Sequence, residues 1–132
     1  MKLPTTLIAA TSLSLCTFTV LANQPPGFYR NTYPEHALPA ALNAGKELMG
    51  KNAQLNAKTR ALVALGVAAQ IPCQYCVYVN QKRARAAGAS EAEIREAVAT
   101  AAHVRQWSTV LYGMNYDFET FKAEFDKIQA SK

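Results

Sequence analysis

The segment from Ala57 to Gln70 constrains the fold of this chain most, because nearly every residue beyond its first turn is apolar. Asn56, whose side chain can cap a helix, stands directly before the segment, and Pro72 follows it closely. A helix that is apolar all round has to be buried on all sides. The sequence therefore predicts a fully buried helix over residues 57–70.

Four further segments repeat apolar residues at helical spacing, and each is bounded by a cap, a glycine or a proline. Ser90 and Glu93 form the pattern of a capping box at the start of the longest one. No segment alternates as a strand does, and no internal repeat is visible. The prediction is an all-α fold with a single domain of about five helices, the other four lying at about 35–49, about 73–87, 90–112 and after Asp117.

Residues 1–22 have the layout of an export signal. Lys2 supplies a positive start, residues 7–20 are apolar with Ser and Thr interspersed, and small residues precede the bond after Ala22. This run is too short for a membrane span, which needs roughly 20 apolar residues. Lipidation of Cys16 is disfavoured because Leu15 before it is large. We expect cleavage after Ala22 and a periplasmic or secreted protein that is free of the membrane.

The remaining chain is long enough for one domain with its own core. Residues 23–34 contain two prolines, a glycine and aromatic residues, and are expected to form an irregular arm before a helical domain over 35–132. The formal net charge is +5 with Lys2 included. The basic residues near the cysteines lack interleaved aromatic residues, so we expect a solvated helix face and no nucleic-acid binding; they are Lys58, Arg60, Lys82, Arg83 and Arg85.

Cys73 and Cys76 are the only cysteines after the predicted cleavage site. Thiols at this spacing lie about one helical turn apart, so they can close a tight disulfide or share redox work. A loop this short gains little entropic stabilisation, which favours a redox role over a structural disulfide. A zinc site with His36 and His103 is disfavoured, since the two histidines show no recognisable ligand spacing. We therefore expect neither a metal nor a bound cofactor.

Three sequence blocks carry a family resemblance: residues 58–65 (Lys-Thr-Arg-Ala-Leu-Val-Ala-Leu), 73–76 (Cys-Gln-Tyr-Cys) and 86–94 (Ala-Ala-Gly-Ala-Ser-Glu-Ala-Glu-Ile). In order and spacing they resemble the carboxymuconolactone decarboxylase and alkylhydroperoxidase D family, over about Leu55 to Met114. The resemblance implies an all-helical domain that assembles as a homotrimer or homohexamer. It also implies reduction of peroxides or disulfides, with an external dithiol as reductant.

The resemblance also implies roles for single residues. It makes Cys76 the thiol that peroxide oxidises and Cys73 its resolving partner, whereas the helix dipole favours Cys73 as the nucleophile. Family peroxidases carry a His and a Glu where this chain has Asn80 and Ala61. Asn80 can bond a thiol or orient a water, but it cannot take a proton. His103 is a candidate replacement base.

These features favour an exported thiol-disulfide oxidoreductase, or an alkylhydroperoxidase-like antioxidant protein, that acts on a small peroxide or a protein disulfide. One alternative is a lyase acting on a lactone carboxylate, as the family's other name suggests. Another is a non-catalytic oligomer whose disulfide is structural.

Overall fold

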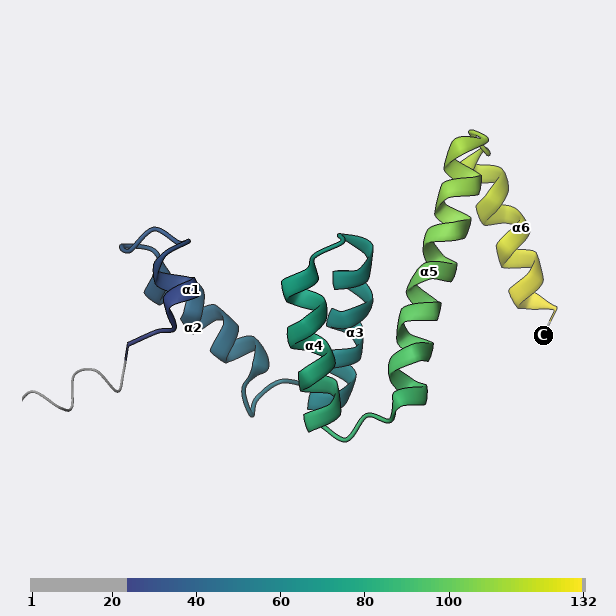
Figure 1. Ribbon diagram of the computed structural model, residues 1–132. Helices are drawn as coiled ribbons and strands as arrows, with labels where there is room; N and C mark the ends of the chain where they lie inside the picture. The colour runs from purple at the N-terminus through teal and green to yellow at the C-terminus, as the bar shows by residue number, and fades with distance from the viewer. Residues whose placement is uncertain (1–23, 132) are drawn as a thin grey trace, which may run out of the picture. The chain divides into compact units, whose positions relative to one another are not determined.

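The computed structural model describes residues 24–131, which form six helices and no strand (Figure 1). The helices are α1 (Gly27–Arg30), α2 (Leu38–Met49), α3 (Ala57–Gln70), α4 (Gln74–Ala86), α5 (Glu91–Gly113) and α6 (Phe118–Ala130). The all-α prediction is confirmed. The predicted export signal, residues 1–22, lies outside the described residues.

The chain divides into two compact units, and the division between Lys46 and Glu47 falls in the last turn of α2. In the first unit, α1 is a single helical turn within the segment expected to be irregular. Two prolines lead into it, and their missing N–H groups cost little there because the first N–H groups of a helix have no intrahelical partner. The Nε of Arg30 donates to the carbonyl of Pro25 at 2.9 Å and ties the turn to the chain before it.

In the second unit, the helix boundaries follow the capping signals closely. The side chain of Asn56 accepts the backbone N–H of Thr59, so α3 begins at Ala57 as predicted. Ser90 and Glu93 form a complete capping box at the start of α5. Gly88 has a φ of 82°, a conformation that residues with a Cβ adopt at a cost, and this lets the chain turn sharply between α4 and α5.

The core of this unit lies where α3 packs against α4 and α5. Its buried residues are Ala61, Leu65, Ala84 and Ile94. Gly66 faces α5 so closely that a Cβ added there would lie 3.5 Å from the Cβ of Ala101. Small side chains thus bring the helices close together, and Leu65 fills the space between them with no exposed surface.

The expectation that α3 is buried on all sides is wrong for the single chain. Val63 and Val67 each keep 56% of their surface exposed. The helices that pack on α3 within its unit are α4 and α5, and two neighbours cover only part of a helix's circumference. The apolar residues on all sides of α3 indicate correctly that other parts of the protein should pack on it. They could not show that α4 and α5 leave one part of its surface exposed.

An ion pair joins the first turns of α3 and α5. The Nζ of Lys58 lies 2.8 Å from a carboxylate oxygen of Glu93. The other oxygen of Glu93 accepts the backbone N–H of Ser90 at 2.7 Å. The ammonium of Lys58, and after it the backbone N–H of Ser90, lower the pKa of Glu93 to about 2.

We expect the Glu93→Gln variant to be less stable than the wild type at neutral pH, because it loses the charge that holds Lys58. The pKa of Glu93 is lower in the folded state than in the unfolded chain, so its contribution is complete above the unfolded pKa near 4.5. That contribution disappears as pH falls from about 4.5 towards about 2. Urea unfolding at several pH values should show the two proteins converging in this window.

Glu96→Gln is the matched control, because Glu96 is exposed on the same helix and takes part in no ion pair among residues 24–131. We expect it to change the free energy of unfolding little. A constant difference between wild type and Glu93→Gln from pH 7 to pH 2 would contradict the assignment.

Candidate redox site at the start of helix α4

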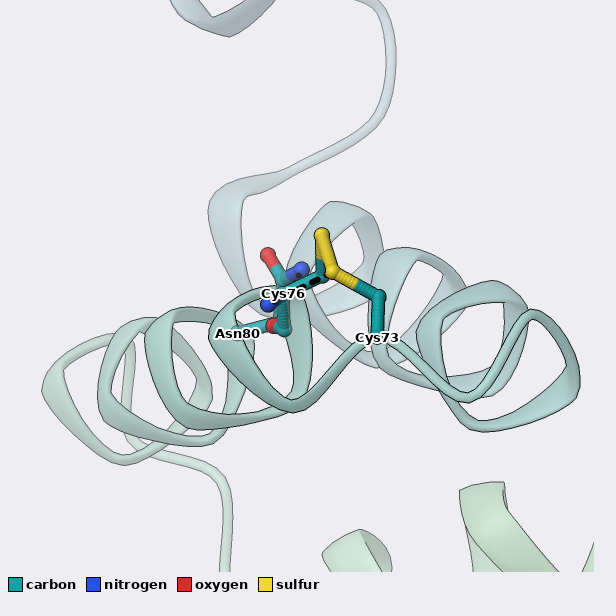
Figure 2. Close-up of a disulfide and its surroundings, with 3 residues drawn as sticks. All are labelled: Cys73, Cys76 and Asn80. Carbon is teal, nitrogen blue, oxygen red and sulfur yellow. Dashed lines mark hydrogen bonds between the residues drawn. A yellow bond between two sulfur atoms is a disulfide. The ribbon is translucent and has the colours of Figure 1, made fainter. Parts of the chain in front are cut away.

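A disulfide joins Cys73 to Cys76 at the N-terminal end of α4 (Figure 2). The two Cα atoms lie 5.3 Å apart, as expected for adjacent turns of chain at a helix start. Both residues are half-buried. The chain reaches this point through a tight turn in which the backbone N–H of Cys73 donates to the carbonyl of Ala68 at 3.2 Å. Pro72 lacks an N–H and helps separate α3 from α4.

Cys73 is also the N-cap residue of α4. Its Sγ accepts the backbone N–H of Cys76 at 3.2 Å. Oxygen side chains usually fill this role, so a sulfur atom here takes over the capping of the first turn. After reduction, the same N–H and the positive end of the helix dipole would favour the thiolate form of Cys73.

Asn80 lies one turn further along α4 and is 8% exposed. Its Nδ2 donates to the backbone carbonyl of Cys76 at 2.9 Å, as the dashed line in Figure 2 shows. In the disulfide form, the amide of Asn80 thus donates to the carbonyl of Cys76 and not to sulfur. Asn80 and the buried Ala61 line one cavity of about 330 Å³ between α3 and α4. The structure therefore brings these two sequence-selected positions together.

His103 lies on an exposed part of α5, with its ring edge-on to Trp107 at 6.3 Å between ring centroids. No hydrogen bond joins it to either cysteine within the described residues. Its role as a base stays a prediction. Over residues 24–131, no three His, Cys, Asp or Glu side chains gather closely enough to hold a metal ion.

The expectation of a solvated basic face holds for part of the group only. Lys82, Arg83 and Arg85 are exposed, although Arg85 pairs with Glu91, and Lys58 pairs with Glu93. Arg60 is half-buried, and its guanidinium donates to the backbone carbonyls of Leu55 and Met49. The sequence signal for this burial was the position of Arg60 on an otherwise apolar helix. A charged side chain on a helix that has to be buried needs hydrogen-bond or ion-pair partners.

None of the helices in the described part of the chain combines the length and the apolar character that a membrane crossing requires. The fold and the site together define an all-helical domain that presents a Cys-x-x-Cys pair at a helix start.

The chain belongs to the carboxymuconolactone decarboxylase family, whose model matches residues 36–117. The match covers all three sequence blocks, one of which is the cysteine pair, so the family prediction is confirmed. This family includes decarboxylases and peroxidase-like enzymes. A search of curated proteins found no match to the chain.

The capping role of Cys73 predicts different effects for two substitutions under reducing conditions. Cys73→Ser keeps an acceptor for the N–H of Cys76, whereas Cys73→Ala removes it. We expect Cys73→Ala to unfold with a free energy about 1 kcal/mol lower than Cys73→Ser. Urea unfolding in excess reductant measures the difference, and equal stabilities would show that the sulfur does not cap α4.

Proposed function

We propose that this protein is an exported thiol-disulfide oxidoreductase of the alkylhydroperoxidase-like kind, with the Cys73 and Cys76 pair as its redox centre. The observation that carries the proposal is the placement of both sulfur atoms at one helix N-terminus, with a backbone N–H directed at Cys73. A helix start stabilises a thiolate without a neighbouring base. The pair can therefore react although Ala61 and Asn80 supply no proton acceptor.

In the peroxide reaction, the thiolate of Cys76 attacks one oxygen of the peroxide. The O–O bond breaks, Cys76 becomes a sulfenic acid, and the other oxygen leaves as an alcohol after it takes a proton. The thiol of Cys73 then attacks the sulfur of Cys76, which forms the disulfide and releases water. An external dithiol reduces the disulfide by exchange and is itself oxidised.

The capping bond favours the other cysteine for disulfide exchange. Because the N–H of Cys76 points to the sulfur of Cys73, Cys73 is the thiol that the helix start stabilises as a thiolate. It would attack a substrate disulfide first, and Cys76 would resolve the mixed disulfide. A small peroxide would thus react first with Cys76, and a protein disulfide would react first with Cys73.

The proposal also includes export to the periplasm or beyond, on the basis of residues 1–22, and assembly as a homotrimer or homohexamer. The exposed surfaces of Val63 and Val67 on α3 support assembly, since an apolar stripe of this kind gains stability when a second copy covers it. No bound cofactor, membrane or nucleic acid is part of the proposal. His103 is retained as a candidate base.

The reduction potential of the disulfide separates a redox centre from a structural bond. We expect a value above about −300 mV in the protein that begins at Asn23, because working couples exchange with dithiols more readily than structural disulfides do. Equilibration with dithiothreitol buffers, followed by thiol alkylation and mass spectrometry, measures it. A potential below about −300 mV would assign the pair to the structural alternative.

Trapping of sulfenic acid identifies the cysteine that peroxide oxidises. After peroxide treatment, we expect the Cys73→Ser variant to accumulate a dimedone adduct on Cys76, because its resolving partner is missing. The Cys76→Ser variant should form little adduct. The opposite labelling pattern would assign peroxide attack to Cys73, and no labelling in either variant would contradict peroxide chemistry.

A further inference from the structure

The chain around the cysteine pair carries charge of one sign. Residues 51–90 contain six Lys and Arg side chains and no Asp or Glu. Lys58 pairs with Glu93 and Arg85 pairs with Glu91, so carboxylates from outside this stretch neutralise two of the six. The other four are in no ion pair over residues 24–131; they are Lys51, Arg60, Lys82 and Arg83. This part of the chain therefore keeps a net positive charge.

Two of these cations belong to α4, the helix that begins at the disulfide. The side chains of Lys82 and Arg83 are both exposed. Arg83 follows Cys76 by seven residues, which places it on the same side of the helix two turns further along. At about 1.5 Å per residue, the two Cα atoms are about 10 Å apart along the axis. About three residues of an extended polypeptide span this distance.

Two exposed tyrosines belong to the first turns of α4. Tyr75 stands between the two cysteines and is 76% exposed, and Tyr78 is 65% exposed. The ammonium group of Lys82 lies over the ring of Tyr78, 5.7 Å from its centroid. Tyrosine is enriched where proteins bind one another, because its rigid ring buries a large area at a low cost in conformational entropy. The helix thus offers aromatic surface in its first turns and positive charge beyond them.

The shape of the surface distinguishes two kinds of substrate. Four cavities of about 330–670 Å³ lie along residues 24–131, and neither cysteine lines any of them. A small organic molecule usually binds in a pocket that buries most of its surface. A protein segment can lie across an open surface and contact several side chains in turn. The surroundings of the disulfide therefore suit a protein partner better than a small organic molecule.

We propose that the cysteine pair exchanges disulfides with an acidic, cysteine-containing segment of another protein that binds along α4. This inference rests on the proposed redox function and names the partner of its disulfide exchange. Carboxylates of the segment pair with Lys82 and Arg83, and its residues next to the cysteine pack on Tyr75 and Tyr78. Opposite charges at an interface raise the rate of encounter more than the final affinity, so the preference is expected in the rate of exchange.

The exchange begins with the cysteine pair already reduced by an external dithiol. The thiolate of Cys73 attacks one sulfur of the partner's disulfide, a mixed disulfide forms, and the partner's other sulfur leaves as a thiolate that takes a proton. Cys76 then loses its proton to water and attacks the sulfur of Cys73. This step restores the disulfide of the pair and releases the partner's second thiol. The partner is reduced by two electrons, and the cysteine pair is oxidised by two.

Three peptide disulfides of equal length test the charge preference. Each is the symmetric disulfide of a peptide with one cysteine, and Glu, Gln or Lys occupies the positions three and four residues from that cysteine. This spacing matches the separation of Cys76 and Arg83 along α4. Stopped flow with the reduced protein that begins at Asn23 gives the rate constants. Each is divided by the rate constant of dithiothreitol with the same peptide, which removes differences in intrinsic reactivity.

We expect the Glu peptide to react about tenfold faster than the Gln peptide at low salt, and the Lys peptide to react slowest. The advantage should disappear at about 1 M salt, where charges are screened over about 3 Å. Equal rates for the Glu and Gln peptides at low salt would overturn the acidic partner. An advantage of the Glu peptide that persists unchanged at high salt would overturn it as well.

Variants locate the charge that the peptide meets. Lys82→Gln/Arg83→Gln should bring the ratio of the Glu and Gln rates from about ten towards one. The matched control is Arg105→Gln/Lys127→Gln, which removes the same charge from exposed positions on α5 and α6 and should keep the ratio. Circular dichroism checks the helix content of both proteins. Equal losses in the two double variants would show that net charge attracts the peptide, and would overturn binding along α4.

A small neutral disulfide separates failure of this inference from failure of the redox proposal. Hydroxyethyl disulfide carries no charge, so its reaction with the reduced protein needs only a reactive cysteine pair. If it reacts while the Glu and Gln peptides react equally, the redox function stands and the acidic partner is wrong. If neither this disulfide nor any peptide reacts, both proposals are wrong.

Discussion

The close packing of α3 on two neighbours is the constraint on which the second unit depends. Leu65 is fully buried in a core that also contains Ala84 of α4 and Ile94 of α5, and Gly66 lets α5 approach α3 closely. This packing sets the position of the α3 C-terminus and hence of the turn that delivers Cys73 to the start of α4. The cysteine pair is therefore attached to the packed core of the second unit.

At the start of α4, one sulfur atom serves the fold and the proposed chemistry together. The bond from the N–H of Cys76 to the sulfur of Cys73 completes the helix cap, and the same bond favours a thiolate after reduction. A sulfur atom is a weak hydrogen-bond acceptor, so this cap is weaker than one made by an oxygen side chain. In the proposed function, this bond takes the place of a neighbouring base for Cys73.

The sequence predicted the helices well because their signals are local. Asn56, the Ser90 and Glu93 capping box, and Gly88 each act on adjacent residues, and the structure bears out all three. Long-range features were harder to predict. The exposed face of α3 depends on how many neighbours its own unit provides. The burial of Arg60 depends on two backbone carbonyls, that of Met49 at the end of α2 and that of Leu55 in the following loop. Neither feature can be predicted from the periodicity of a single helix.

Asn80 and Ala61 show what a departure from a family pattern leaves in place. An alanine methyl group and an amide stand where the resemblance places a carboxylate and an imidazole, so neither side chain can accept a proton. Both residues nevertheless line the cavity between α3 and α4, and the Nδ2 of Asn80 donates to the backbone carbonyl of Cys76. The two positions therefore keep a structural relation to the cysteine pair although they cannot form a proton relay with it.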